Sequence, residues 1–344
     1  MLNEALTSLS INTYFAKESC VILTDILTVS KTWHKVYKVR MRIVLIGQAA
    51  FGARVLEKLL ETGEAVVGVF TPPDIRGKPN PLREEAAKRG IPVFWHKGKW
   101  TWDIYEEFTR LNPDLNVMAF VTSILPEFLI NYPKLGTIQY HPSLLPKHRG
   151  GSAINWAIIK GETKTGVTIF RPDKGIDTGP ILLQKEVAIS SDDTVGTLYF
   201  NKLFPVGIEA IIESIKLIKE GKAPKTPQDE SQATYEGLCT EKDTVIDWRQ
   251  SAAKVYNLIR GSNPQPGAVT NFGSLRFKVF DSELLVGGSG KAGEITEIND
   301  KGLVVAAQSG SILIKRVQLE GLPKIGAAEF AEEVGLKVGD LLGV

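Results

Sequence analysis

Cysteine, histidine and long apolar runs are all scarce in this chain of 344 residues. Its two cysteines, Cys20 and Cys239, are far apart, which argues against a disulfide framework and a structural zinc site and favours a reducing compartment. The four histidines form no H-x-x-H or H-x-x-x-H pair, so a bound metal is not expected. No stretch reaches the roughly 20 apolar residues that a membrane-spanning helix needs. We therefore expect a cytoplasmic protein with no metal and no membrane partner.

Charge of one sign is scarce as well. The net charge is +2, which gives no reason to infer binding to a bulk polyanion. Hydrophobic residues make up 43% of the chain and charged residues 23%, which is typical of globular proteins. The length is sufficient for two domains with ordinary cores.

The first 40 residues differ from the rest. The apolar stretch 21–29 is interrupted by Asp25, and no basic region precedes it, so it is not typical of a secretory signal. Acidic residues such as Glu4 and Glu18 also disagree with a mitochondrial presequence. Domain-like sequence begins at Met41. Residues 1–40 are predicted to be an upstream extension, or a start placed too early, without an ordered fold.

From residue 41 the pattern alternates between short apolar strands and amphipathic helices. Strands are predicted over 43–46, 65–70, 91–94, 115–120 and 136–140, and helices over 51–60, 82–89, 101–111 and 126–130. This alternation predicts an α/β fold with a doubly wound, Rossmann-like parallel sheet over residues 41–225. Within that domain, 155–160 and 194–220 read as helices, and the isoleucine stripe of the second is predicted to face the core.

The pattern changes in the last third of the chain. Residues 226–240, rich in proline and polar side chains, are predicted to be a linker. A helix over 251–260 and five short strands between 268 and 318 predict a small OB-like β-barrel domain over 241–325. The end of the chain, 326–344, is predicted to be a loose tail or a short helix.

The turn after the first strand has two glycines, Gly47 and Gly52, in the spacing G-x-x-x-x-G. It lacks the middle glycine that lets a backbone approach a pyrophosphate, and no acidic residue ends the second strand. We therefore expect no NAD in this chain.

Two short runs carry the chemistry. The first, over 139–150, reads QYHPSLLPKHRG, and the second, over 173–179, reads DKGIDTG. Pro142 cannot continue a strand ladder, so His141 is predicted at a strand end, where an open α/β sheet places its ligands. The second run places Asp177 in a tight turn. Each feature alone is more often structural, but a histidine and a carboxylate in one crevice would form an acid–base pair.

The two runs together resemble those of the 10-formyltetrahydrofolate-dependent formyltransferases and formyl hydrolases. The resemblance extends in order over residues 41–320 and includes the segments VTSILP at 121–126, SAINW at 152–156 and ATYEG at 233–237. Within the family, the sequence is most similar to the amino-terminal hydrolase part of 10-formyltetrahydrofolate dehydrogenase. It is also similar to methionyl-tRNA formyltransferase. The resemblance implies a formyltransferase domain followed by an OB-like domain.

The resemblance also implies roles for particular residues. His141 and Asp177 stand at the catalytic positions, with His141 assisting the oxyanion or the leaving N10 and Asp177 orienting the ring or holding the attacking water. Most transferases of the family carry asparagine where this chain has Gln139, and the hydrolase part of the dehydrogenase has an apolar residue there. Gln139 is therefore a third catalytic candidate that fits neither pattern. His148, between Lys147 and Arg149, is predicted to be solvated or positioning and not the catalytic base.

The same resemblance implies a folate pocket. The pterin would lie against Ser123, Ile124 and Leu125 and against the loop of four residues Ser143, Leu144, Leu145 and Pro146. The expected small molecule is 10-formyltetrahydrofolate or its product tetrahydrofolate, which acts here as the formyl donor. An apolar pocket with a few polar groups is typical of small-ligand sites.

The formyl acceptor is left open between three readings. Hydrolysis to tetrahydrofolate and formate, or transfer to a small acceptor, ranks first. Methionyl-tRNA ranks second, because the loop over 76–81 is short and has few basic residues, whereas phosphate contacts dominate nucleic-acid affinity. The third reading is a weakly catalytic folate-binding module that interacts with a carrier or a separate dehydrogenase.

Overall fold

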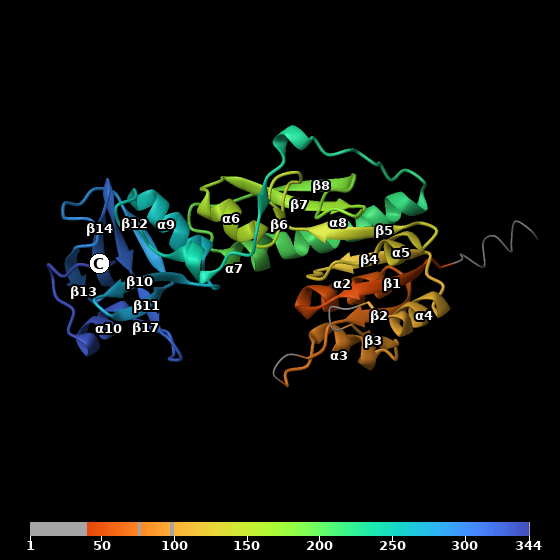
Figure 1. Ribbon diagram of the computed structural model, residues 1–344, viewed down its shortest axis with the longest axis horizontal. Helices are drawn as coiled ribbons and strands as arrows, with labels where there is room; N and C mark the ends of the chain where they lie inside the picture. The colour runs from red at the N-terminus through yellow and green to blue at the C-terminus, as the bar shows by residue number, and fades with distance from the viewer. Residues whose placement is uncertain (1–39, 75–76, 97–99, 344) are drawn as a thin grey trace, which may run out of the picture. The chain divides into compact units, whose positions relative to one another are not determined.

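The computed structural model describes residues 40–74, 77–96 and 100–343. The predicted extension over 1–40 therefore lies outside the described residues, apart from Arg40. Seven strands form the sheet of the first domain, in the order β3-β2-β1-β4-β5-β7-β8 (Figure 1). They are β1 (Arg42–Gly47), β2 (Ala65–Thr71), β3 (Val93–Trp95), β4 (Leu115–Ala119), β5 (Thr137–His141), β7 (Lys164–Phe170) and β8 (Ile181–Ala188). Strands β1 to β5 are mutually parallel, as the sequence predicted.

The last two strands of this sheet differ from that prediction, because β7 is antiparallel to β5 and β8 is antiparallel to β7. The connection from β5 to β7 begins and ends at the carboxyl end of β5, so the chain does not cross the sheet there. A burial pattern reveals that a strand is covered, not which way it runs. The sheet is therefore parallel at five strands and mixed at one edge.

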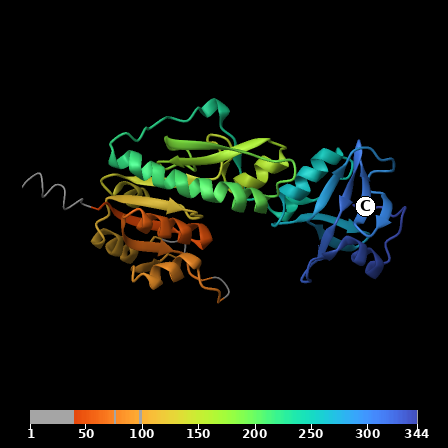
Figure 2. The same cartoon turned by 180° about the vertical axis from the view of Figure 1, so that it is seen from behind.

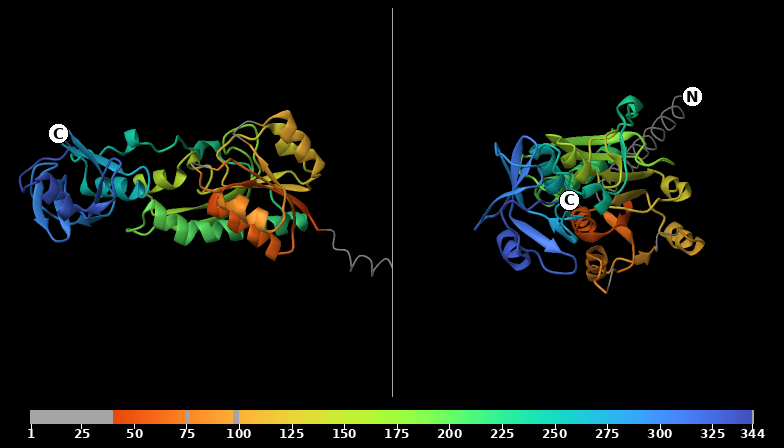
Figure 3. Two further views of the ribbon diagram at one scale, coloured as in Figure 1. Left: turned by 90° about the horizontal axis from the view of Figure 1, so that it is seen from below. Right: turned by 60° about the vertical axis from the view of Figure 1, so that its left-hand side comes forward.

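Helices cover both faces of the sheet. They are α2 (Ala49–Glu61), α3 (Pro81–Lys88), α4 (Trp102–Arg110), α5 (Glu127–Asn131), α6 (Ala153–Ile159) and α8 (Phe204–Lys219). Helices α2 and α8 pack together and lie side by side on one face (Figures 2 and 3). On the opposite face, Phe108 of α4 and Leu129 of α5 share a core with Val44 and Ile46 of β1. This double cover explains why β1 is almost entirely apolar.

The helix predicted over 194–220 has three parts. A short helix α7 (Val195–Leu198) leads into a π-helical turn η1 (Tyr199–Leu203) and then into α8. Pro205 has no N–H to donate, and a widened turn just before it is a usual consequence. By length and composition alone, residues 195–219 could cross a membrane. The apolar side of α8 instead packs against the sheet and α2, which confirms the predicted core stripe.

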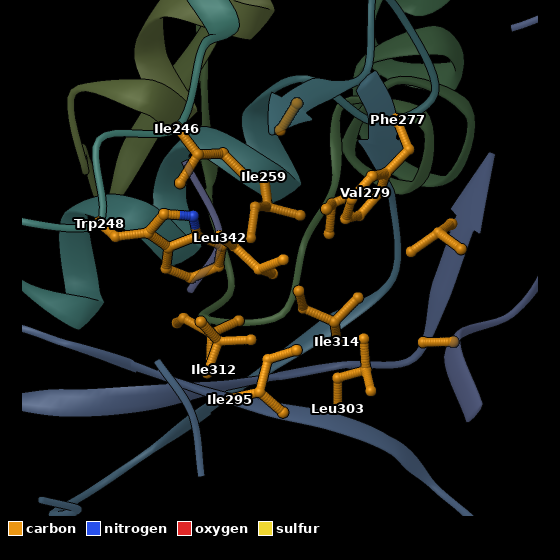
Figure 4. Close-up of a cluster of buried hydrophobic side chains, with 14 of the residues drawn as sticks. Ile246, Trp248, Ile259, Phe277, Val279, Ile295, Leu303, Ile312, Ile314 and Leu342 are labelled. Carbon is orange, nitrogen blue, oxygen red and sulfur yellow. The ribbon is translucent and has the colours of Figure 1, made fainter. Parts of the chain in front are cut away.

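Two antiparallel sheets of four strands each form the second domain, in the orders β10-β11-β16-β17 and β12-β15-β14-β13. Their strands are β10 (Ala268–Phe272), β11 (Leu275–Val279), β12 (Ser282–Leu285), β13 (Ile295–Asn299), β14 (Gly302–Ala307), β15 (Gly310–Ile314), β16 (Arg316–Leu319) and β17 (Ile325–Gly326). Helix α9 (Ala252–Gly261) contributes Val255 and Ile259 to their shared core, which also contains Phe277 and Ile314 (Figure 4). The predicted antiparallel β-domain is confirmed, with more strands than the five expected.

The predicted tail over 326–344 is part of this core. Helix α10 (Ala327–Val334) buries Phe330 and Ala331, and beyond it Leu336 and Leu342 are buried in the same cluster. Gly335 ends the helix in the left-handed conformation, which is a usual C-terminal signal. Of the two readings of this segment, the short helix is confirmed, and hydrophobic packing holds it through Leu342.

The predicted linker over 226–240 makes specific contacts with the first domain. Its short strand β9 (Tyr235–Glu236) pairs in parallel with β6 (Arg149–Gly150), a strand in the loop after β5. At its start, Thr226 forms a bridge with Ile181 of β8. The polar, proline-rich composition does not predict these contacts, because most of them are hydrogen bonds of the backbone.

Candidate active site

His141 is the last residue of β5 and is buried, at the carboxyl end of the parallel strands. The strand ends there because Pro142 follows, as predicted, although it begins and ends one residue later than expected. Strand β4 ends at the same edge, so the segment 121–125 leaves the sheet next to His141. Ligand crevices of open α/β sheets form at such edges.

Both ring nitrogens of His141 face oxygen atoms. Nε2 lies 2.8 Å from the backbone oxygen of His148. Nδ1 lies 3.4 Å from Oδ2 of Asp177, within ion-pair distance. A carbonyl and an ionised carboxylate can only accept hydrogen bonds, so each ring nitrogen of His141 faces an acceptor.

Asp177 occupies the turn predicted from the second run, in the left-handed region with a φ of 55°. The other carboxylate of the turn, Asp173, accepts from the Gly175 N–H and the Thr178 hydroxyl, so it has a local structural role. Asp177 instead reaches across to the first run, where its Oδ2 accepts the Gly150 N–H at 2.9 Å. The turn thus presents one carboxylate of its pair to the site.

Gln139 lies two residues before His141 on the same side of the strand. Its Nε2 donates to Oδ1 of Asp177 at 3.5 Å, the long limit of a hydrogen bond. The structure therefore brings together all three predicted catalytic candidates, Gln139, His141 and Asp177. The Gln139 amide therefore donates a hydrogen bond to the carboxylate that also faces His141.

The loop after His141 is held by side chains that the sequence reading missed. The Thr168 hydroxyl donates to the backbone oxygen of Ser143 at 2.6 Å and accepts the Leu145 N–H at 3.1 Å. Gln184 donates to the backbone oxygen of Leu145 at 2.8 Å. Thr168 pairs with His141 in the sheet. Thr168, a polar residue at a buried position of β7, was the available signal, because such a residue needs partners.

The predicted folate-contacting residues divide into anchors and exposed groups. Leu125, Ser143 and Leu145 are buried, and Leu125 belongs to the core beside α5. Ile124 is 79% exposed. The buried hydroxyl of Ser123 has no hydrogen-bond partner among the residues that the structure describes. Leu144 and Pro146, in the loop after His141, are half-buried.

Of the two readings of His148, solvated or positioning, the solvated one is wrong. Its ring is buried, with Nδ1 at 3.2 Å from Oε2 of Glu236 and Nε2 at 3.1 Å from Oε1 of Glu162. Its neighbour Arg149 is also fully buried and pairs with Glu230 at 2.7 Å. The hydrogen bond to Glu230 raises the pKa of Arg149 above its ordinary value. These carboxylates are distant in sequence, so the basic residues of the loop gave no sign that His148 and Arg149 are buried among acidic partners.

Metal-ligating side chains do not gather in the site. Within the described ranges 40–74, 77–96 and 100–343, no three His, Cys, Asp or Glu residues are placed to hold a metal ion.

The G-x-x-x-x-G turn has a packing role, because a β-carbon on Gly47 would clash with the backbone oxygen of Ala119 on the neighbouring strand.

Comparison with known proteins identifies the family of both domains. The family model of the formyl transferase matches residues 41–215, and that of the formyl transferase C-terminal domain matches residues 239–335. The chain is 43% identical over 305 residues to the cytosolic 10-formyltetrahydrofolate dehydrogenase of Mus musculus, covering 84% of this chain and 34% of that protein. It thus spans about a third of the length of that relative. The methionyl-tRNA formyltransferase of Geobacter sulfurreducens is 37% identical over 309 residues, which cover 88% of this chain and 97% of that protein.

Solved structures show the same fold. HypX from Aquifex aeolicus, crystallised with tetrahydrofolic acid, has a TM-score of 0.65 at 20% identity and covers 88% of this chain and 48% of its own. An N-formyltransferase from Helicobacter canadensis has a TM-score of 0.61 at 20% identity and covers 80% and 98%. The resemblance read from the two runs is confirmed. With both family domains matched in order, the chain belongs to the formyl transferase family.

Proposed function

We propose that this chain releases the formyl group of 10-formyltetrahydrofolate, with water or a small amine as the acceptor. The observation that carries the proposal is the pair of His141 and Asp177, 3.4 Å apart at the carboxyl end of the sheet. Membership of the formyl transferase family supports the reaction type, and the dehydrogenase relative supports the folate as formyl donor.

The chemistry follows from the charges that develop. The acceptor adds to the formyl carbon, the carbonyl oxygen becomes an oxyanion, and the carbon–N10 bond then breaks as N10 takes a proton. To serve the oxyanion and then protonate N10, His141 turns one ring N–H from its present acceptor, the His148 oxygen or Asp177, toward the substrate, and the proton given to N10 is replaced by the one that the attacking water or amine loses. Asp177 keeps the ring in place, and Gly150 keeps Asp177 in place. With water as the acceptor, the products are formate and tetrahydrofolate.

The surroundings of the pair support a folate pocket. Ile124 offers an exposed apolar wall, and the Ser123 hydroxyl offers a hydrogen-bonding group whose partner is not among the described residues. The loop 143–146 is fixed by Thr168 and so presents a rigid backbone. Rigid polar groups on apolar walls suit a planar heterocycle.

The preference for a small acceptor rests on charge. Arg83, in α3 just after the 76–81 loop, is already paired with Asp74 at 2.9 Å and covers the ring of Trp95. Lys78 is exposed. An arginine engaged by a carboxylate is a poor phosphate contact, and tRNA binding needs several such contacts.

Methionyl-tRNA is the second candidate, for one reason. The alignment with the Geobacter sulfurreducens methionyl-tRNA formyltransferase covers 97% of that protein, including both domains, whereas only about a third of the dehydrogenase is matched. A transferase with this two-domain layout would use the same His141 and Asp177. The two candidates therefore differ in acceptor and not in formyl donor.

One comparison separates the candidates: formate release and formylation of methionyl-tRNA, each measured with the same enzyme and the same 10-formyltetrahydrofolate. We expect formate, or a formylated small amine, as the main product. Rapid tRNA formylation, with an affinity that falls steeply as salt rises, would reverse the ranking. Binding of tetrahydrofolate without turnover of any acceptor would instead favour the third reading, a folate-binding module that serves a carrier or dehydrogenase partner.

Replacing Gln139 by leucine tests the amide next to the carboxylate. If this amide assists the developing charge, Gln139→Leu should lower turnover by about 10²–10³-fold, the usual effect of losing one such donor. Affinity for 5-formyltetrahydrofolate, a stable analogue, should change little, because the assistance grows only as charge develops. Turnover and binding are measured on the same preparation. Wild-type turnover in Gln139→Leu would leave His141 and Asp177 as the whole catalytic apparatus.

A further inference from the structure

Residues 226–237, here named the clasp segment, border the loop after His141 along its length. The Thr234 N–H donates to the backbone oxygen of Pro146, and the Arg149 N–H donates back to the oxygen of Thr234 at 2.9 Å. The Thr234 hydroxyl accepts the His148 N–H at 2.8 Å. The clasp segment is therefore hydrogen-bonded to the loop that follows His141.

Gln228 connects the clasp segment to the other half. Its Nε2 donates to the backbone oxygens of Asp177 at 2.8 Å and Gly179 at 2.7 Å. Its Oε1 accepts from Arg149 twice, from Nε at 3.0 Å and from one terminal nitrogen at 2.8 Å. One side chain thus joins the Asp177 turn to Arg149, which precedes the Gly150 N–H that holds the Asp177 carboxylate.

The partners of Gln228 leave its amide one orientation. Guanidinium groups only donate and backbone oxygens only accept, so the amide oxygen must face Arg149 and the amide nitrogen must face the turn. Both protons and both lone pairs of the amide are then used. No other common side chain offers two donors and two acceptors at that length. Asparagine is a methylene shorter and cannot span the same distance.

The turn needs such support. Asp177 has a φ of 55°, a conformation that a β-carbon disfavours, and the turn approaches Arg171 so closely that any side chain on Gly179 would clash with its backbone oxygen. A residue held in a sparsely populated conformation persists only when its surroundings fix it. Two N–H groups directed at the backbone of the turn provide that restraint.

We propose that Gln228 is a positioning residue for the reaction, which holds the Asp177 carboxylate against His141 through the backbone of the turn. The inference rests on the proposed function, because it assumes that Asp177 and His141 act together in formyl transfer. It also gives the clasp segment a role in turnover that its linker-like composition does not indicate. Gln228 itself touches neither His141 nor the reacting atoms.

The decisive variant is Gln228→Glu. It keeps the length of the side chain and strengthens the contact with Arg149, but it sets a carboxylate oxygen against the backbone oxygens of Asp177 and Gly179. We expect kcat to fall about 10²-fold, the usual cost of a displacement near 1 Å in a catalytic group. The dissociation constant for 5-formyltetrahydrofolate should stay within about threefold. Gln232→Glu is the matched control, since it makes the same charge change at an exposed position of the clasp segment and should keep wild-type kcat.

A double-mutant cycle distinguishes positioning from general support. If Gln228 acts through Asp177, Gln228→Glu should have no further effect in an Asp177→Asn background, measured by single-turnover formate release. An equal loss in both backgrounds, or wild-type kcat in Gln228→Glu, would overturn the inference. If Gln228→Glu fails to fold in a thermal melt, Gln228→Met tests the same loss of donors without a new charge. A wild-type protein with no formyl turnover would overturn the proposed function and, with it, a role of Gln228 in turnover.

Discussion

His141→Ala is expected to lower the turnover of 10-formyltetrahydrofolate by about 10²–10⁴-fold, the usual contribution of a positioned acid–base group. The ring is buried between two acceptors, the backbone oxygen of His148 and the carboxylate of Asp177, so no neighbouring side chain replaces its protons. Binding of 5-formyltetrahydrofolate should change far less than turnover. Formate release under saturating donor measures the effect, and a thermal melt confirms that the variant is folded.

A second variant of His141 avoids the full cavity that alanine would leave in place of the ring. His141→Asn retains a donor toward Asp177, at the place of the ring Nδ1, and fills part of the space, but its amide cannot give up a proton to N10. We expect a loss close to that of alanine. If His141→Asn restores most of the activity, the ring serves as a hydrogen-bond donor and not as an acid. Wild-type turnover in both variants would remove His141 from the mechanism.

The position of His141 could be predicted from the sequence because its cause is local. Pro142 has no N–H, so the strand must end next to it, whatever the rest of the chain does. The turn around Asp177 has local causes too, since Asp173 satisfies Gly175 and Thr178 within five residues. The contact between the two residues has no local cause. It was predicted from the resemblance of this chain to the formyltransferase family, and in the structure Nδ1 of His141 lies 3.4 Å from Oδ2 of Asp177.

The errors have nonlocal causes. His148 looked solvated because Lys147 and Arg149 flank it, yet its partners Glu162 and Glu236 lie 14 and 88 residues away in sequence. The direction of β7 cannot be read from a pattern of buried residues, because a covered strand has the same pattern in either direction. Long-range partners and strand direction need the folded chain.

The clasp segment shows a further limit of composition. A stretch with proline, glutamine and acidic residues reads as a linker, because no apolar period marks it. Its contacts include a hydrogen bond that the Thr234 hydroxyl accepts and two that the Gln228 amide donates, and they leave no period in the sequence. A polar segment can thus be structural when it satisfies buried groups, such as the guanidinium of Arg149, that would otherwise lack partners.

Asp177→Asn is expected to cost as much turnover as His141→Ala, because an acid–base pair fails as a unit. Asparagine tolerates the left-handed backbone at this position and can still accept the Gly150 N–H. It lacks the negative charge that faces Nδ1 of His141. The expected loss is about 10²–10⁴-fold in formate release. Combining it with His141→Ala should add little further loss.

The same variant separates the two roles open to Asp177, orienting His141 and holding the attacking water. Hydroxylamine is a strong nucleophile that attacks without losing a proton first, so it bypasses a group whose task is to hold or activate water. We expect the Asp177→Asn loss to persist with hydroxylamine, because the carboxylate oxygen nearest the ring is the one fixed by the Gly150 N–H. Restoration to within about tenfold of the wild type would assign Asp177 to the water. Wild-type formate release in Asp177→Asn would show that the carboxylate is a turn residue only, and that His141 acts without it.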